Sequence, residues 1–430
     1  MILCGLAGRD GVFKVSSWIP IYQSQLGRRL GVLSRMFCRA YQIAILPKWA
    51  IVITVPRIPF NRPTIAPMQA SYVNEAFQNG HLSGDGPFTK KASLALSELH
   101  GGSKVLLTTS CTSALELCAL LLDLQPGDEV IVPSFTFVSS ANAFVIMGAT
   151  IVFAEVEKET LSISARTVEH LITPRTKAIV AVNYGGAPSV TQDLVSLAVA
   201  HDVVIVEDNA HGLFGSHEDK PLGTQSALST LSFHETKNIT CGEGGALVIN
   251  DPNFIERAEI MREKGTNRTQ FFRGTIDKYT WVEKGSSYLM SDINAAILLS
   301  QLEFAQTIQQ RRHDAFSLYM ASLKEWANLF GATLPTHLHH DNRPFHMFPI
   351  MMPDLKSRTE LIKVAKSKEV SLTFHYVPLH NSPGGDQFGH FSDDFSNTQR
   401  ISDVLVRLPL FSDISEVEVR KVIDVVENFS

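Results

Sequence analysis

The sequence predicts an α/β fold, in which helices cover a mostly parallel sheet and a smaller α+β domain follows. Apolar strand segments alternate with helical segments between residues 112 and 233, an order that yields parallel strands joined by crossover helices. The strand segments are continuous apolar runs, as at 129–133 and 203–207, and such runs are typical of strands buried on both faces. A hydrophobic content of 44% over 430 residues allows a core of this size.

The helices and strands of the large domain are predicted from the spacing of apolar residues and from the turn residues that end each segment. Residues 112–124 are apolar at helical spacing and stop at the turn Gln125-Pro126-Gly127-Asp128. Gly148 closes the next helical segment. In chain order, helices are expected at 112–124, 139–147 and 194–201, and strands at 129–133, 150–155, 176–184, 203–207 and 227–233.

The C-terminal third has a different pattern of predicted helices and strands, which indicates a second domain. A long helix is expected at 291–312, followed by strands at 345–352 and 369–376 that flank a helix at 355–368. This pattern predicts a smaller α+β domain packed over the first. The predicted boundaries are an N-terminal extension at 1–57, a large domain at 58–305 and a small domain at 306–430.

Residues 1–57 form a basic segment. They contain eight Lys or Arg residues against Asp10 alone, a net charge of 8 − 1 = +7, while the remainder carries −12. This composition resembles an Arg-rich transit peptide, and it also fits a start codon placed too early or a dispensable extension, which is the interpretation we favour. The apolar run 50–55 is too short to span a bilayer. We expect a chain that begins at Ile58 to be folded, dimeric and active.

The overall composition argues against several functional classes. The net charge of −5 and the acidic character of the remainder are unlike a nucleic-acid-binding domain. The cysteines are odd in number and scattered without a C-x-x-C pair, so neither a disulfide framework nor a metal site is predicted. A reducing cytoplasm is the expected location, with no membrane or nucleic-acid partner. The five cysteines are Cys4, Cys38, Cys111, Cys118 and Cys241.

The most informative residues are a lysine and an acid that each follow an apolar strand segment. Asp208 follows 203–207, and Lys237 follows 227–233; ligands of open α/β sheets bind beyond the carboxyl ends of strands, so both are expected to face one crevice. A lysine amine condenses with an aldehyde, and a carboxylate pairs with a protonated pyridine nitrogen. The pair predicts a site for pyridoxal 5'-phosphate (PLP). Taken singly, the lysine also fits a solvated charge and the acid a helix cap or an ion-pair partner.

From about Ile58 onward, the chain resembles the sugar-nucleotide aminotransferases (DegT/DnrJ/EryC1/StrS type) of the fold-type I PLP-dependent transferases. Within the family its motifs are most similar to the subgroup that aminates a dTDP-linked 4-keto-6-deoxy sugar. The family motifs are Asn61-Arg62-Pro63, Gly84-Asp85-Gly86-Pro87, 126–130 and the Asp208–Lys237 pair; the subgroup motifs are 233–238, 263–268, 271–274 and 277–281.

The resemblance implies roles for individual residues at the cofactor site. Lys237 would hold PLP and move the reacting proton, and Asp208 would pair with the pyridine nitrogen. His211 would contact the ring or orient Asp208, or be a structural histidine. Phosphate contacts are expected from Cys111, where many relatives have glycine, and from Thr112, both at a helix start, and from Ser232. Phe137 would stack on the ring.

The resemblance also implies a homodimer whose active sites are shared between subunits. Ser287 stands where the family commonly has an asparagine that contacts the phosphate of the partner's cofactor. Substrate contacts are expected from basic and aromatic residues, which suit a diphosphate and a base or sugar ring. The candidates are Arg273, Lys278, Tyr279, Trp281, His375, Tyr376 and His380.

The expected reaction follows from the subgroup resemblance. Glutamate would donate an amino group to dTDP-4-dehydro-6-deoxy-D-glucose, giving dTDP-4-amino-4,6-dideoxy-D-galactose and 2-oxoglutarate for a surface polysaccharide such as enterobacterial common antigen. The alternatives are the same chemistry on a GDP- or UDP-sugar and a non-catalytic regulator on this fold. In the sugar-dehydrating branch the lysine is replaced by histidine, so Lys237 argues against that activity.

Overall fold

The computed structural model describes residues 42–45, 51–54, 57–338 and 342–429. Most of the extension predicted at 1–57 lies outside the described residues, apart from Arg57 and the antiparallel strands β1 (Gln42–Ile45) and β2 (Ile51–Thr54). Among the described residues, no helix is both long enough and apolar enough to cross a membrane.

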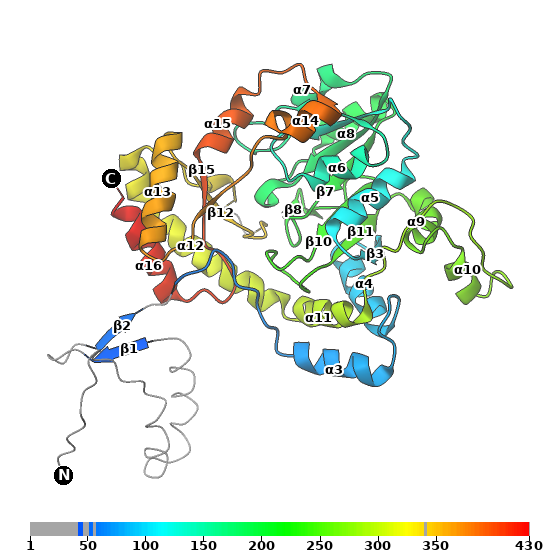
Figure 1. The fold of residues 1–430 in the computed structure, drawn as a ribbon, viewed down its shortest axis with the longest axis horizontal. Helices are drawn as coiled ribbons and strands as arrows, with labels where there is room; N and C mark the ends of the chain where they lie inside the picture. Colours follow the sequence, from blue (N-terminus) through cyan, green and yellow to red (C-terminus); the bar gives the residue numbers. More distant parts are fainter. Residues whose placement is uncertain (1–41, 46–50, 55–56, 339–341, 430) are drawn as a thin grey trace, which may run out of the picture.

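Helices and strands alternate through the large domain, as expected (Figure 1). The helices are α3 (Gln69–Asn79), α4 (Pro87–Leu99), α5 (Cys111–Leu121), α6 (Ser139–Val145), α7 (Ala165–Val168), α8 (Gln192–Ala200), α9 (Ile255–Arg262), α10 (Arg268–Phe272) and α11 (Asp292–Glu303). The strands are β3 (Lys104–Thr108), β4 (Glu129–Pro133), β5 (Thr150–Ala154), β6 (Thr176–Val182), β7 (Val204–Asp208), β8 (Ser216–His217), β9 (Lys220–Pro221), β10 (Leu228–Ser232) and β11 (Gly245–Ile249).

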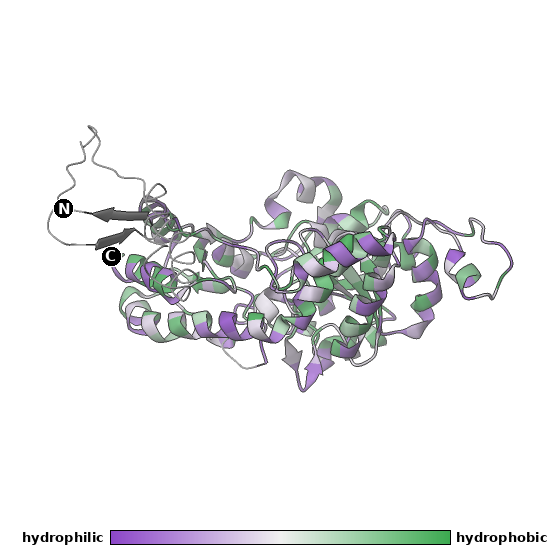
Figure 2. Cartoon of the chain, turned by 90° about the horizontal axis from the view of Figure 1, so that it is seen from below, coloured by the Kyte–Doolittle hydropathy of each residue, from purple (hydrophilic) through white to green (hydrophobic). Residues whose placement is uncertain are grey.

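The central sheet has eight strands in the order β14-β5-β4-β6-β7-β10-β11-β3, where β14 is Gly389–His390. Its pairings are parallel from β14 to β10, and β11 is antiparallel to both of its neighbours. The predicted mostly parallel sheet is therefore confirmed. The strands are apolar along their whole length because both faces of the sheet are buried. Val130 packs on one face and Ile131 on the other, each beneath helices. Figure 2 shows the hydrophobic residues gathered on these inner strands.

The smaller part of the chain has its own sheet and core. Its sheet has the order β12-β15-β13, and long helices cover it. The elements are α12 (Ala305–Phe330), β12 (Phe348–Met351), α13 (Leu355–Ser367), β13 (Thr373–Phe374), α14 (Pro383–Phe388), α15 (Ser396–Val404), β15 (Leu405–Leu408) and α16 (Glu416–Glu427).

The prediction of a single long helix at 291–312 is wrong, because the structure has two helices separated at Phe304. The break allows α11 to pack against α3 and α4, while α12 turns away and packs against α16. Helical spacing continues across the break, so local sequence did not reveal it. We propose that Phe304 marks the passage between the two domains.

Two other segments cross the boundary predicted at 305/306. Ile58 is completely buried in the core of the smaller part, and its N–H donates to the Glu369 carbonyl at 2.9 Å. In the opposite direction, β14 pairs with β5 at the edge of the large sheet. The chain thus links the two parts at three places, which restricts how they move relative to each other.

Asp292 joins two helices of the large domain through hydrogen bonds. Its buried carboxylate accepts from the Phe88 N–H at 3.2 Å, the Thr89 N–H at 2.7 Å and the Thr89 hydroxyl at 2.8 Å. It therefore satisfies the free N–H groups at the start of α4, although it lies about 200 residues away along the chain. Gly86 is required beside it, because a Cβ there would overlap the Asp292 carboxyl group.

We predict that Asp292→Ala lowers the free energy of unfolding by about 1–3 kcal/mol, because it leaves buried donors without an acceptor. Denaturant titration followed by circular dichroism measures this change. The control is Glu427→Ala, which removes an exposed acid from α16 and should alter stability by less than about 0.5 kcal/mol. Equal stability of the two variants would contradict the role of Asp292.

Candidate functional site

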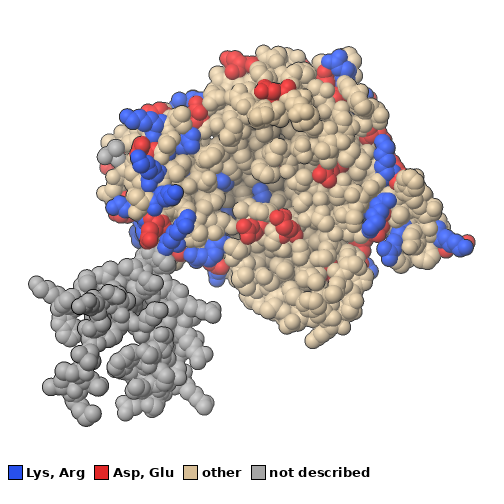
Figure 3. Space-filling view, in the orientation of Figure 1, with Lys and Arg blue, Asp and Glu red and all other residues tan. Residues whose placement is uncertain are grey.

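A cavity of about 530 Å³ lies where the carboxyl ends of the large-domain strands meet the smaller part. Figure 3 shows a hollow on this face with basic atoms inside it. The two basic residues with long side chains in its lining are Lys237 and Arg407, and the acidic ones are Asp208 and Glu243. Its lining also includes Phe60, Asn61, Ser110, Cys111, Thr112, Thr136, Phe137, Ser139, His211, Ser232, Gly244, His346, Phe374, His375 and Tyr376.

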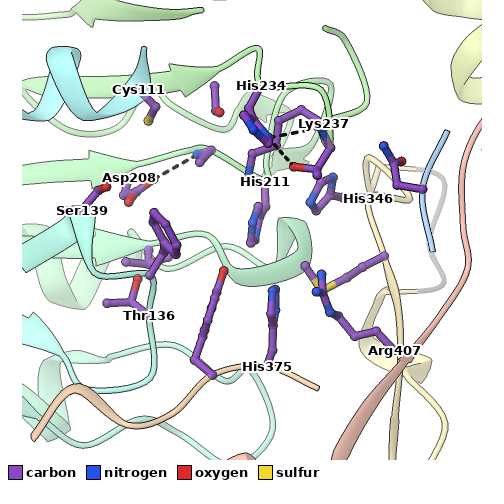
Figure 4. Close-up of a pocket in the computed structure, with 18 of the residues that line it drawn as sticks. Cys111, Thr136, Ser139, Asp208, His211, His234, Lys237, His346, His375 and Arg407 are labelled. Carbon is purple, nitrogen blue, oxygen red and sulfur yellow. Dashed lines mark hydrogen bonds between the residues drawn. The ribbon is translucent and has the colours of Figure 1, made fainter. Parts of the chain in front are cut away.

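Asp208 ends β7 and lies inside this cavity (Figure 4), with only 6% of its surface exposed. One carboxylate oxygen accepts from the Ser140 hydroxyl at 2.7 Å, and the other accepts from the Ala210 N–H at 3.2 Å. Thr136 in turn contacts Ser140 at 2.9 Å. Both partners of Asp208 are neutral, so its charge remains available to a cationic ligand atom.

Lys237 follows β10 and enters the same cavity. Burial lowers the pKa of its amine to about 8, and the nearby charge of Arg407 acts in the same direction. An amine with this pKa is neutral in about a tenth of the molecules at pH 7, far more than for an exposed lysine, and the neutral form is the nucleophile. The sequence thus correctly predicted that Asp208 and Lys237 face one crevice.

The start of α5 presents backbone N–H groups at the same end of the cavity, an arrangement that suits an anion. Ser110 caps this helix by accepting from the Ser113 N–H at 3.0 Å, which leaves the first-turn N–H groups of Cys111 and Thr112 without helical partners. A Cβ on Gly245 would overlap the backbone here, so glycine allows β11 to approach the helix start. The Cys111 thiol itself is inert as a nucleophile, because burial raises its pKa to about 12.

Several other predicted contacts also line the cavity. Ser232 and Phe137 lie in the lining, and Phe137 is 57% exposed. His211 lies in the lining as well, but it stacks on His346 with ring centroids 4.4 Å apart, and its Nδ1 accepts from the Gly185 N–H at 3.4 Å rather than contacting Asp208. Burial lowers the pKa of His211 well below its usual value, so this ring is neutral.

The predicted substrate residues separate into two groups. His375 and Tyr376 line the cavity, and the Tyr184 hydroxyl lies 3.0 Å from His375 Nδ1. Arg273, Lys278, Tyr279 and Trp281 lie outside it, in the segment that follows α10 at the far end of the large domain (Figure 1).

His380 and Ser287 also lie outside the cavity. His380 is buried, contacts Ser134 Oγ at 2.6 Å and stacks on Phe395 at 4.0 Å; we therefore no longer assign it to substrate binding. Its closeness in sequence to His375, five residues earlier, was misleading, because the short helical turn at 379–381 directs it into the core. Ser287 is exposed and forms a β-bridge with Glu263.

Sequence reasoning missed several lining residues from the smaller part and from the N-terminal segment. His346 lies in the cavity and contacts Asn238 Oδ1 at 2.8 Å, which connects the segment after Lys237 to the smaller part. Asn61 donates to the Glu235 carbonyl at 2.9 Å from the other side. Arg407 stands within the apolar strand β15. An isolated arginine in an apolar strand is itself an unusual signal, which could have marked Arg407 in advance.

Comparisons with known proteins agree with this geometry. A model of the DegT/DnrJ/EryC1/StrS aminotransferase family matches residues 63–427. The spore coat polysaccharide biosynthesis protein SpsC of Bacillus subtilis is 29% identical over 86% of this chain and 96% of its own length. Helicobacter pylori PseC, an aminotransferase involved in pseudoaminic acid biosynthesis, is 25% identical with a TM-score of 0.79 over 86% and 98% of the two chains. The PLP-form of Spr1654 from Streptococcus pneumoniae is 25% identical with a TM-score of 0.79 over 87% and 98%.

The cofactor of this family is PLP, and the residues of the cavity fit it. The α5 start and Ser232 present donors suited to a phosphate, and Lys237 presents an amine suited to an aldehyde. Asp208 presents a carboxylate with neutral partners, suited to a pyridinium. We propose that these residues and Phe137 hold the cofactor. Among the described residues, no cluster of three or more metal-ligating side chains occurs.

We predict that aldehyde capture by Lys237 in the cofactor-free protein rises with pH and levels off above about pH 8. The amine must lose its proton before it attacks, and burial lowers its pKa to about 8, whereas an exposed lysine needs about pH 10. Borohydride trapping of PLP across a pH series, followed by peptide mass spectrometry, measures this. Lys237→Ala should abolish the label and Lys278→Ala, at an exposed lysine, should retain it. Trapping at another lysine would overturn the assignment.

A second prediction concerns Asp208→Asn, which should reduce turnover by orders of magnitude while the protein still folds. The substitution removes a charge-assisted contact worth about 1.5–3 kcal/mol and weakens the electron withdrawal that the ring nitrogen provides. Single-turnover absorbance measures the rate, and circular dichroism reports the fold. Asp202→Asn, at an exposed position, serves as control. Near-normal turnover of Asp208→Asn would mean that this acid is structural.

Proposed function

Because the chain belongs to the DegT/DnrJ/EryC1/StrS aminotransferase family of PLP-dependent sugar aminotransferases, we propose that its amino acceptor is dTDP-4-dehydro-6-deoxy-D-glucose. L-Glutamate would be the amino donor, and the products would be dTDP-4-amino-4,6-dideoxy-D-galactose and 2-oxoglutarate. The observation that carries the transamination is the presence of Lys237 and Asp208 in one cavity. The choice of sugar nucleotide is supported by the sequence motifs at 233–238 and 263–281.

Bound PLP supplies an electron sink for the carbanion character that develops at the reacting carbon. The Lys237 amine removes the proton from Cα of the amino donor and later returns a proton to C4 of the sugar. One residue serves in both directions because its lowered pKa keeps the neutral and protonated forms close in free energy near neutral pH. Asp208 would pair with the protonated pyridine nitrogen of bound PLP, and Ser140 and the Ala210 N–H keep its carboxylate oriented.

The sugar would lie among neutral polar side chains. His346, His375 and Tyr376 line the cavity, and burial lowers the pKa of both histidines and raises the pKa of the tyrosine. All three are therefore neutral at physiological pH, and each has a hydrogen-bonding group. Neutral donors and acceptors suit the hydroxyl and keto groups of a sugar, which carry no charge.

We further propose a homodimer in which each subunit completes the site of the other. Ser287 is exposed and lies outside its own chain's cavity, so it is available to a partner's cofactor phosphate. The surface formed by α10 and the segment after it is also unusually apolar, since Phe272 is 69% exposed and Trp281 is 76% exposed. In this proposal Arg273, Lys278, Tyr279 and Trp281 bind the nucleotide in the partner's site.

The proposed product fits synthesis of a surface polysaccharide, such as enterobacterial common antigen, in the cytoplasm. The relative SpsC is named for spore coat polysaccharide biosynthesis, which supports this general role. The nearest competing proposal is the same chemistry on a GDP- or UDP-linked sugar, because the nucleotide contacts lie outside the described cavity. A non-catalytic regulator on this fold is disfavoured by the presence of both Lys237 and Asp208 in the cavity.

The proposal is tested by incubating the PLP-loaded protein with glutamate and a panel of dTDP-, UDP- and GDP-4-keto sugars. We expect amination of the dTDP sugar to have the highest kcat/KM, with product mass as readout and NMR to establish the configuration at C4. The Lys237→Ala protein is the matched control and should give no product. Preference for a UDP or GDP sugar would overturn the substrate proposal, and no turnover on any sugar would overturn the enzymatic one.

A further inference from the structure

His346 has one ring nitrogen that faces the cavity without a partner. The ring belongs to the cavity lining, and its Nδ1 contacts Asn238 Oδ1 at 2.8 Å. Within the described parts of the chain, Nε2 has no hydrogen-bond partner, and it is not among the polar atoms that are sealed from solvent without one. Nε2 of His346 is therefore open to a molecule that enters the cavity.

The hydrogen bonds of Asn238 determine which nitrogen of His346 carries the proton. The Asn238 amide donates through Nδ2 to the Pro344 carbonyl at 2.6 Å, and a carbonyl only accepts. The Asn238 Oδ1 therefore faces His346 and accepts from its Nδ1–H. Burial lowers the pKa of His346 well below its usual value, so the ring is neutral and carries only this one proton. Nε2 is consequently an acceptor with a free lone pair.

The ring stacked on His346 has the opposite tautomer. His211 Nδ1 accepts from the Gly185 N–H at 3.4 Å, so the single proton of this neutral ring lies on Nε2. The centroids of the two rings are 4.4 Å apart, and in Figure 4 both rings lie between Lys237 and His375. The stacked pair thus offers a ligand one donor and one acceptor, and His346 is the member that accepts.

The main chain holds His346 in this orientation. Phe345, the preceding residue, is buried and has a φ of +46°, which is unfavourable for a residue with a side chain. Arg312 donates to the carbonyls of Phe345 and His346, at 2.9 Å and 2.5 Å. A backbone conformation of this kind persists only where the surrounding structure imposes it, and such conformations cluster at ligand sites. The free lone pair is therefore presented in a fixed direction.

The group that binds Nε2 must donate a proton. Asn238 directly follows Lys237, and the charge of Lys237 is among the causes that lower the pKa of His346, so the ring lies near the amine that reacts. The oxygen of a reacting ketone only accepts and does not suit this nitrogen. A hydroxyl on the carbon next to the ketone is the nearest donor that a sugar brings to this part of the cavity.

We propose that His346 Nε2 accepts a hydrogen bond from the hydroxyl next to the reacting ketone, so that the amino acceptor is recognised as an α-hydroxy ketone. This inference rests on the proposed aminotransferase function. In dTDP-4-dehydro-6-deoxy-D-glucose the hydroxyl is on C3, because C5, the other neighbour of C4, carries the methyl group and the ring oxygen. Glutamate has no hydroxyl, so the contact distinguishes the two substrates that use the cavity in turn.

The test combines variants of His346 with a substrate that lacks the hydroxyl. His346→Asn retains a donor for Asn238 and removes the acceptor at Nε2, whereas His346→Gln places an amide oxygen near the Nε2 position. His201→Asn, at an exposed histidine, is the control. Calorimetry measures the Kd of each PLP-loaded protein for the dTDP-linked 4-keto-6-deoxy sugar and for its 3-deoxy analogue, without an amino donor. Stopped-flow absorbance separately follows conversion by glutamate.

We expect His346→Asn to weaken binding of the parent sugar by about 3- to 10-fold, as for one neutral hydrogen bond. The wild type should bind the 3-deoxy analogue more weakly by a similar factor. On the analogue, His346→Asn should match the wild type within about twofold, because the hydroxyl and its acceptor act as a pair. His346→Gln should recover part of the loss, and glutamate conversion should stay within about twofold of wild type in every variant. The control should match the wild type throughout.

The contrary results are distinct from one another. Equal weakening of both sugars by His346→Asn would make the residue structural and overturn the proposal. If melting temperatures show that this variant is misfolded, the wild type decides, since equal binding of the two sugars would also overturn it. Slower glutamate conversion with unchanged sugar binding would assign His346 to Lys237 instead. Failure of the wild type to aminate any keto sugar would overturn the proposed function on which the inference rests.

Discussion

The parallel arrangement of the central strands is the constraint on which the rest of the site depends. Parallel strands place all their carboxyl ends at one edge of the sheet, so residues far apart in the sequence are brought together there. Asp208 ends β7, Ser232 ends β10, and the α5 start follows β3. The antiparallel strand β11 adds only a close backbone approach, through Gly245, and no side chain to this edge.

The cavity keeps its charges reactive by surrounding them with neutral groups. Hydroxyl and amide partners hold Asp208, and the neighbouring histidines are uncharged because burial disfavours their protonated forms. A direct ion pair between Asp208 and a lysine or arginine would use the charges that the chemistry needs. The structure instead leaves Lys237, Asp208 and Arg407 separate within one space, each suited to a different group of cofactor or substrate.

The site lies between two parts of the chain that are connected several times. Phe304 separates α11 from α12, Ile58 enters the core of the smaller part, and β14 returns to the large sheet. Hydrogen bonds from Asn61 to the Glu235 carbonyl and between Asn238 and His346 hold the segment around Lys237 from both sides. Correct positioning of the lysine therefore depends on both parts, and mutations in the smaller part can affect catalysis without contacting the cofactor.

The sequence by itself determined the parallel α/β sheet and the Asp208–Lys237 pair. Both depend on local features, namely the continuous apolar runs of the strands and the reactive side chains that directly follow them. Only the tertiary structure decided the break at Phe304, the removal of His380 to the core and the entry of His346 and Arg407 into the cavity. The physical reason is that these outcomes depend on packing between segments more than 100 residues apart. Local spacing reports which face of an element is apolar, but it does not report which distant element will cover that face or which polar side chain will be left at the opening between them.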